Sequence, residues 1–235
     1  MRGATSSREG SPSAWTASDL VDAPANDLAD RFIVVSGSIG AGKSTLVNGL
    51  SAAVGSEAVI ERHSENPYLQ SFYESPARWA FHVQAAFLKL SIEDYERVGT
   101  VGGAVLERTL EERQDVFARE LFESGALSHE EFEILARLQR IATEHPLPRP
   151  DLLVYLHAPP DVLAERIAAR DRSGESNVSL GYLQGLGSRY EQFAAAWGAS
   201  PLVTIDTLEV DVRKQEGLAE VTDRCARALA GRRSG

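Results

Sequence analysis

The stretch that decides the fold is Gly37-Ser38-Ile39-Gly40-Ala41-Gly42-Lys43-Ser44, which directly follows the apolar run 32–35. It fits the pattern G-x-x-x-x-G-K-[ST], in which glycines allow backbone N–H groups to surround phosphate oxygens. The next apolar residues, Leu46, Leu50 and Val54, have the spacing of a helix. The stretch therefore predicts a phosphate-binding loop between a buried strand and a helix.

The loop supplies more than backbone donors. The N-terminus of the helix after it is electropositive and attracts phosphate. Lys43 adds a point charge, and the hydroxyl of Ser44 can hold Mg²⁺. Together with Thr45, these residues are candidates for binding the phosphates of ATP.

Composition favours one ordinary globular domain. The chain has 235 residues, of which 43% are hydrophobic and 25% are charged, so it can bury one sizeable core. Residues 1–29 are rich in Ser, Ala, Asp and Pro and lack the apolar segment of a signal peptide. We predict a disordered leader over 1–29 and a single domain over 30–235.

Charge and cysteine content exclude several classes of function. A formal net charge of −10 argues against nucleic acid or an anionic membrane as a partner, because binders of either normally carry a basic excess. No stretch approaches the roughly 20 apolar residues of a membrane span. Cys225 is the single cysteine, which excludes an internal disulfide and favours a reducing compartment, so we expect a cytoplasmic location.

Strand-like and helical patterns alternate along the chain. Beyond the first strand, buried strands are predicted at 58–60, 103–106, 152–156 and 203–205. Helices beyond the phosphate loop are predicted at 76–98, 112–125, 129–144, 161–171, 179–196 and 211–230. Such alternation predicts an α/β fold with a central five-stranded parallel sheet covered by helices on both faces.

Charged residues follow two of these strands. Glu61 comes after the second predicted strand, and Glu107 and Arg108 come after the third. Ligands of open α/β sheets bind outside the carboxyl ends of the strands, so these side chains should face the same crevice as Lys43. A kinase requires this combination: a base for the attacking hydroxyl, a carboxylate on the Mg²⁺ side, and cations on the transferred phosphoryl group.

A cluster of arginines forms a third candidate site. Arg166 and Arg170 share one face of a predicted helix, and Arg172 follows in a polar stretch. This pattern is typical of a lid that closes arginines over a triphosphate and excludes water.

The chain resembles the deoxynucleoside kinase family, the P-loop kinases that phosphorylate the 5′-hydroxyl of deoxynucleosides. The resemblance extends from about residue 31 to the C-terminus. It depends most on the segment 65–84, ENPYLQSFYESPARWAFHVQ, and on Glu107-Arg108-Thr109, which fits the family's E/D-R-S/T motif. The segments 150–156 and 166–183 are similar to the family's fourth strand and lid.

The resemblance implies roles for individual residues. Glu61 is expected to be the general base for the 5′-hydroxyl. Arg108 is expected to lie near Glu61 and near the phosphates, and Glu107 is expected to support the Mg²⁺ site. Tyr73 and Glu175 match the pair that holds the sugar 3′-hydroxyl. A further match is Gln84, at the position of the amide that hydrogen-bonds the nucleobase. Relatives are commonly homodimers packed through two helices, for which 76–98 and 129–144 are candidates.

The positions that read the base depart from the family pattern. Many relatives carry an arginine and an aspartate where this chain has Ser91 and Arg113. A buried Arg113 could donate to the carbonyl groups of guanine, hypoxanthine or uracil. It could also turn to solvent and leave Glu112 nearer the base, so the sequence leaves the accepted base open.

Other functions fit parts of this pattern. A nucleoside monophosphate kinase shares the fold, but its acceptor is already an anion, which Glu61 would repel. The altered base positions would suit a kinase for a modified or antibiotic nucleoside. A binding-only regulator that has lost catalysis would gain little from Glu61, Glu107 and Arg108. The leading interpretation is a kinase that uses ATP and Mg²⁺ to phosphorylate a nucleoside.

Overall fold

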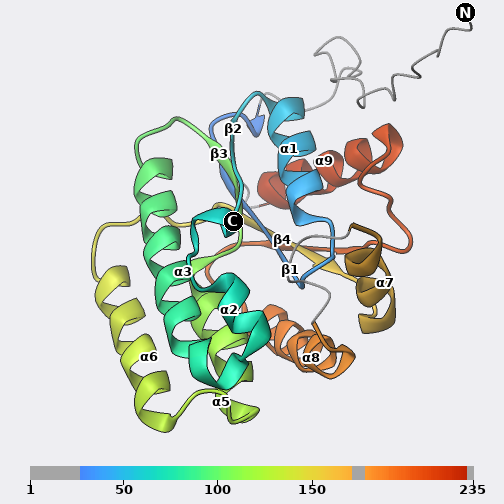
Figure 1. The fold of residues 1–235 in the computed structure, drawn as a ribbon. Helices are drawn as coiled ribbons and strands as arrows, with labels where there is room; N and C mark the ends of the chain where they lie inside the picture. Colours follow the sequence, from blue (N-terminus) through green and yellow to red (C-terminus); the bar gives the residue numbers. More distant parts are fainter. Residues whose placement is uncertain (1–26, 171–177, 232–235) are drawn as a thin grey trace, which may run out of the picture.

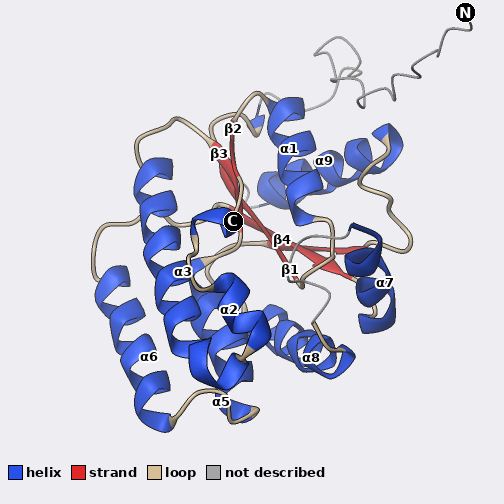
Figure 2. Ribbon diagram, in the orientation of Figure 1, coloured by secondary structure: helices blue, strands red, loops and turns tan. Residues whose placement is uncertain are grey.

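The computed structural model describes residues 27–170 and 178–231, and its centre is a sheet of five strands (Figures 1 and 2). The strands are β1 (Phe32–Gly37), β2 (Glu57–Val59), β3 (Ala104–Glu107), β4 (Leu152–His157) and β5 (Leu202–Asp206). They lie in the order β2-β3-β1-β4-β5, and every neighbouring pair is parallel. The predicted five-stranded parallel sheet is confirmed, with strand ends shifted by one or two residues.

Alternate residues of each strand face opposite sides of the sheet. In β1, Ile33 and Val35 belong to one core cluster, whereas Phe32 and Val34 belong to another. All four are buried. A strand that is covered on both faces reads as a nearly continuous apolar run, which explains why residues 32–35 are so easily recognised in the sequence.

Helices cover both faces of the sheet. The first cluster is completed by α1 (Lys43–Val54), α7 (Pro160–Arg170) and α9 (Gln215–Ala230). The second is completed by α3 (Pro76–Val98) and α8 (Leu180–Ala196). A third cluster joins α3 to α2 (Leu69–Glu74) and to α6 (His129–Thr143), the helix at the lower left in Figure 1.

The segment after β3 differs from the single helix predicted over 112–125. It consists of α4 (Leu110–Glu112), a π-helix, η4 (Arg113–Ala118), and α5 (Arg119–Glu123). A π-helix has a wider turn than an α-helix and is common at functional sites. Apolar spacing did not reveal it, because one widened turn hardly changes the pattern of buried residues.

Three other helical segments also differ from the prediction. The short α2 and the 3₁₀-helix η3 (His63–Glu65) were not predicted, since neither spans enough residues to show a period. The last helix begins at Gln215, four residues later than predicted. Asp211 Oδ1 accepts a hydrogen bond from the Arg213 backbone N–H at 3.1 Å, and such a local bond competes with helix formation.

Buried residues lie near both ends of the part of the chain that the structure describes. Leu28 is fully buried and belongs to the first core cluster. At the other end of the chain, Cys225 on α9 is also fully buried, and burial raises the pKa of its thiol to about 12. Among residues 27–170 and 178–231, no helix has both the length and the apolar character needed to cross a membrane.

Candidate active site

The phosphate loop has the backbone geometry that its glycines permit. Gly37 has φ 141°, and a Cβ there would lie 2.6 Å from the Leu156 carbonyl oxygen. Gly42 has φ 96° and is the residue that precedes α1. Residues with side chains rarely adopt either conformation. The loop therefore depends on glycine at both positions.

Lys43 lies inside this loop. Its Nζ donates a hydrogen bond to the Ser38 carbonyl oxygen at 2.9 Å and lies 3.8 Å from Glu107 Oε1. Burial, together with repulsion from Arg108, lowers the pKa of Lys43 to about 8. The ammonium group is poorly hydrated here, so a bound phosphate would be a strong partner for it.

Glu107 links the loop to the end of β2. Its Oε2 accepts hydrogen bonds from Ser44 Oγ at 2.9 Å and from the backbone N–H of Glu61 at 3.4 Å. Carboxylate and hydroxyl oxygens are ligands that Mg²⁺ prefers beside substrate phosphates. Glu61, His63 and Glu107 also present ligand atoms within 4.8 Å of one another. Oxygen ligands for a cation thus gather next to the phosphate loop.

A cavity extends from the phosphate loop between α2, α3 and η4. It brings together most of the predicted site residues, which are far apart in the sequence. Those that line it are Ile39, Gly40, Gly42, Lys43, Ser44, Thr45, Glu61, Tyr73, Gln84, Glu107, Arg108, Arg113 and Arg170. We refer to it as the main cavity.

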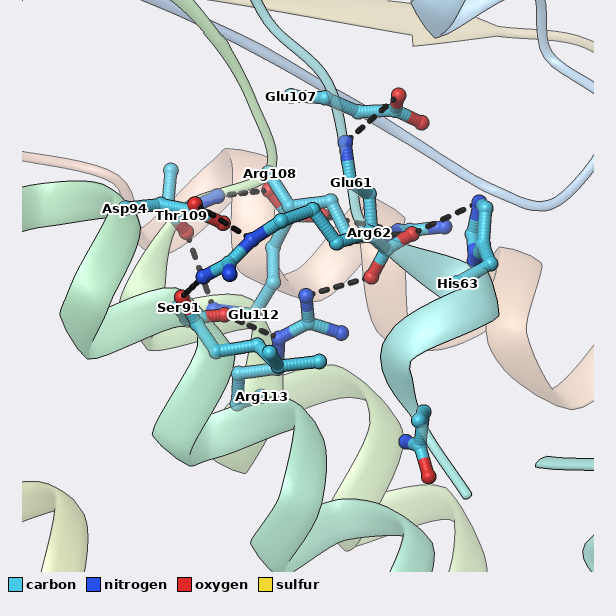
Figure 3. A network of polar contacts seen from close by, with 12 residues as sticks. Glu61, Arg62, His63, Ser91, Asp94, Glu107, Arg108, Thr109, Glu112 and Arg113 are labelled. Atoms are coloured by element: carbon cyan, nitrogen blue, oxygen red, sulfur yellow. Dashed lines mark hydrogen bonds and ion pairs between the residues drawn. The ribbon is translucent and has the colours of Figure 1, made fainter. Parts of the chain in front are cut away.

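Glu61 is the centre of an ionic network in this cavity (Figure 3). Its Oε2 lies 2.8 Å from Arg108 Nε and 3.5 Å from His63 Nε2, and its Oε1 lies 2.5 Å from Arg113 Nη2. Burial alone would raise the pKa of Glu61, but the two guanidinium groups outweigh it and hold that pKa well below its usual range. The carboxylate therefore stays ionised at neutral pH.

Arg108 is held in a strained backbone conformation. It has φ 76°, the single positive φ among the described non-glycine residues. Its Nη1 donates to the Gly37 carbonyl oxygen at 3.2 Å and to Tyr190 Oη at 2.5 Å, and its guanidinium lies over the Phe117 ring. Non-glycine residues in such conformations cost about 1–3 kcal/mol and concentrate at functional sites.

Glu112 helps to hold Arg108 in place. One carboxylate oxygen accepts from the Thr109 N–H at 2.8 Å, which forms a capping box. The other accepts from Tyr190 Oη at 2.8 Å and lies 3.3 Å from Arg108 Nη1. The side chain is fully buried. Because these contacts occupy its carboxylate, Glu112 is not available to read a base, contrary to one alternative raised by the sequence.

Arg113 points into the main cavity. It does not turn to solvent, which was the other possibility raised by the sequence. It is 6% exposed. Besides its contact with Glu61, its Nε donates to Ser91 Oγ at 2.9 Å, and its guanidinium lies 4.7 Å from the centre of the Phe87 ring. The two positions that depart from the family pattern are therefore in direct contact.

Four predicted phosphate-binding residues lie outside the main cavity. The Gly37 carbonyl faces Arg108, and Ser38 lines a separate pocket beside Tyr190. Ala41 and Arg166 line a second cavity between the phosphate loop and residues 207–213. There Arg166 donates to Thr207 Oγ1 at 2.8 Å and to its carbonyl oxygen at 3.1 Å. Arg172 and Glu175 lie outside the described residues.

Several residues of the site were not predicted from the sequence. His63, Phe117 and Tyr182 line the main cavity, and Tyr190 supports Arg108. Burial lowers the pKa of His63 and raises those of both tyrosines. The position of His63, two residues after Glu61, was a signal that could have been used. Nothing local in the sequence marks Tyr190.

This chain is similar to known proteins in sequence and in fold. The family model for deoxynucleoside kinase matches residues 33–227. A deoxyadenosine/deoxycytidine kinase of Bacillus subtilis is 30% identical over 203 residues, which is 85% of this chain and 94% of that protein. A deoxyguanosine kinase of the same organism is also 30% identical, over 77% and 86% of the two chains.

The fold is shared with a solved structure. The deoxyadenosine kinase of M. mycoides with bound dATP has a TM-score of 0.73 at 22% sequence identity, covering 82% of this chain and 98% of that one. The family model that matches residues 33–227 and the two relatives at 30% identity point to the same family as this structure. This chain belongs to the deoxynucleoside kinase family.

Proposed function

We propose that the main cavity binds a nucleoside with its 5′-hydroxyl at Glu61, while the phosphate loop binds ATP. The overall reaction is the family's: the γ-phosphoryl group of ATP is transferred to the 5′-hydroxyl of a nucleoside. The observation that carries the assignment of roles is the position of Glu61. It is a buried, ionised carboxylate in the same cavity as Lys43.

In this proposal Glu61 accepts the proton of the 5′-hydroxyl as the oxygen attacks phosphorus. Arg108 holds the carboxylate through its 2.8 Å contact and lies beside the loop that binds the phosphates. Lys43 stabilises the charge that develops on the transferred group. Phosphoryl transfer depends mainly on such positioning and electrostatics, so a preformed set of cations is what the reaction needs.

The donor set fits Mg²⁺. Ser44 and Glu107 would hold the ion directly or through water, next to the phosphates. When bound, Mg²⁺ would neutralise charge on the phosphate oxygens. The arginines of the predicted lid, Arg166, Arg170 and Arg172, would add cations over the triphosphate. The second cavity, which Arg166 lines, would accept part of the donor nucleotide.

The far end of the main cavity fits a nucleoside. It is lined by Tyr73 and Gln84 between apolar walls that include Phe72 and Phe87. We propose that Tyr73, with Glu175, binds the sugar and that Gln84 binds the base. An acceptor that carries its own phosphate is disfavoured because Glu61 would repel it.

The test is ATP-coupled phosphorylation of a panel of deoxynucleosides, ribonucleosides and their monophosphates, with Mg²⁺ and with EDTA. We expect turnover of at least one nucleoside that requires the metal and no turnover of monophosphates. Turnover of monophosphates alone would assign the chain to the nucleotide kinases. ATP binding without any turnover would favour the regulator, and this function would then be wrong.

A homodimer is also proposed. Helix α6 packs against α3 and leaves Ile134, Leu138 and Ile141 between 42% and 49% exposed on one stripe. Such a stripe fits the same helix of a second copy.

The location we propose remains the cytoplasm.

Charging this stripe should separate the dimer. Leu138→Glu would place a carboxylate in the apolar contact, which is costly when it is buried without a partner. We expect a dimer for the natural chain and a monomer for the variant by light scattering coupled to gel filtration. The matched control is Leu208→Glu, at a leucine that is 57% exposed and far from α6 in the sequence. A Leu138→Glu protein that stays dimeric would place the interface elsewhere.

A further inference from the structure

The nucleobase end of the main cavity contains one residue that can only donate hydrogen bonds. Arg113 lines the cavity together with Gln84, Phe87 and Glu61. Its guanidinium has five N–H donors and no acceptor. Two of its nitrogens are engaged, by Ser91 Oγ at 2.9 Å and by Glu61 Oε1 at 2.5 Å. The residue thus spans the distance between the base end of the cavity and the proposed general base.

Gln84 cannot by itself decide which base is bound. Its side chain is 5% exposed, and its Oε1 is buried without a hydrogen-bond partner among the described residues. Buried acceptors are normally paired with a donor, and a bound nucleobase can supply one here. An amide has both a donor and an acceptor, so a half-turn lets it pair with the amino edge of adenine or with the lactam edge of guanine.

Arg113 does discriminate between these edges. Guanine and hypoxanthine present two acceptors, O6 and N7, which a guanidinium can contact together. Adenine presents an N6 amino group in place of O6, and two donors facing each other repel. Ser91 supports the same outcome, because its hydroxyl holds Arg113 by Nε, so that both outer nitrogens can contact the nucleobase once Nη2 leaves Glu61.

Because Arg113 also contacts Glu61, the identity of the nucleobase can affect catalysis. While Arg113 holds Oε1 and Arg108 holds Oε2, both oxygens of the carboxylate are engaged. A carboxylate in two ion pairs is poorly placed to accept a proton from the substrate hydroxyl. A base that draws Arg113 away would leave Oε1 open to the 5′-hydroxyl.

We propose that Arg113 selects 6-oxopurine nucleosides: it leaves Glu61 to donate to O6 and N7 of guanine or hypoxanthine, and stays on Glu61 when the base is adenine. This inference rests on the proposed function and deepens it. Arg113 would then determine which nucleoside is accepted, and it would also control whether the substrate hydroxyl can reach the general base Glu61.

The experiment compares nucleosides that differ at position 6. Steady-state kinetics are measured with 2′-deoxyguanosine against 2-aminopurine deoxyriboside, and with 2′-deoxyinosine against 2′-deoxyadenosine. For the natural chain we expect kcat/KM to favour the 6-oxo member of each pair by about 5- to 150-fold, the range of one good bidentate contact. In Arg113→Met, which keeps an unbranched side chain over Phe87, each ratio should fall to about 3-fold or less.

The two kinetic constants separate this role from a merely structural one. In Arg113→Met, kcat for deoxyadenosine should stay equal or rise, because Oε1 is released, while KM for deoxyguanosine rises. A structural role would lower kcat for all four nucleosides alike, and this result would overturn the proposal. The matched control is Arg119→Met, because Arg119 also lies over a phenylalanine, Phe132, at 4.5 Å but does not line the cavity.

Failure of the inference can be told apart from failure of the function. A natural chain that phosphorylates deoxyadenosine as well as deoxyinosine overturns the inference and leaves the kinase assignment intact. If no nucleoside is turned over, the function fails, and the inference is then judged by calorimetric binding of the same four nucleosides. Equal affinity within each pair would overturn it, and a 6-oxo preference lost in Arg113→Met would support it.

Discussion

Replacing Glu61 with glutamine is expected to lower kcat for nucleoside phosphorylation by about 10²- to 10⁴-fold, the usual contribution of a general base. The amide keeps the size of the side chain but cannot accept the proton. It also gives up two ion pairs with Arg108 and Arg113. The measurement is the steady-state rate at saturating nucleoside and ATP.

A neighbouring glutamate serves as the control. Glu65 is exposed and contacts Arg62, outside the main cavity. Glu65→Gln should leave kcat within about 2-fold of the natural chain, since surface charges of this kind contribute little. Equal rates for Glu61→Gln and the natural chain would assign the base elsewhere. Calorimetric binding of ATP to both variants shows whether the site remains formed.

The largest expected loss of stability follows from Glu112→Leu. The substitution removes the acceptor for the Thr109 N–H and for Tyr190 Oη, and leaves Arg108 with one carboxylate partner fewer. Breaking a buried ion pair on one side costs about 3–5 kcal/mol in the free energy of unfolding. Urea unfolding followed by circular dichroism measures it.

The chain contains a matched control for this change. Glu131 occupies the same position in the capping box of α6, but that box is exposed. Glu131→Leu should cost about 0.3–1.5 kcal/mol, the value of a surface cap. Similar losses for the two variants would mean that the buried network around Glu112 contributes no more than its cap.

The sequence allowed the sheet to be predicted because its information is local. Residues 32–35 of the strand before the phosphate loop are all apolar, and the loop needs glycine at positions such as Gly37 and Gly42. Both facts can be read from a few adjacent residues. The order of the strands could not be predicted, because it depends on contacts between segments far apart in the chain.

The candidate site was predictable to the same extent. Lys43 was recognised from its place in the phosphate-loop motif. Glu61 and Glu107 were recognised because they come at the ends of predicted strands, and parallel strands bring their carboxyl ends to one edge. The partners of Arg113 could not be predicted. Arg113 reaches Glu61 from the first position of the π-helix η4, and neither this widened turn nor its packing leaves a periodic signal in the sequence.

The buried cysteine makes the natural chain a ready background for labelling. Cys225 is the sole cysteine, its thiol is inaccessible, and its raised pKa keeps it from forming the thiolate that reacts with maleimides. A cysteine introduced at an exposed site, such as Glu130 on α6, would carry a single fluorophore. Energy transfer between labelled copies could then follow the association of subunits without any change to the core.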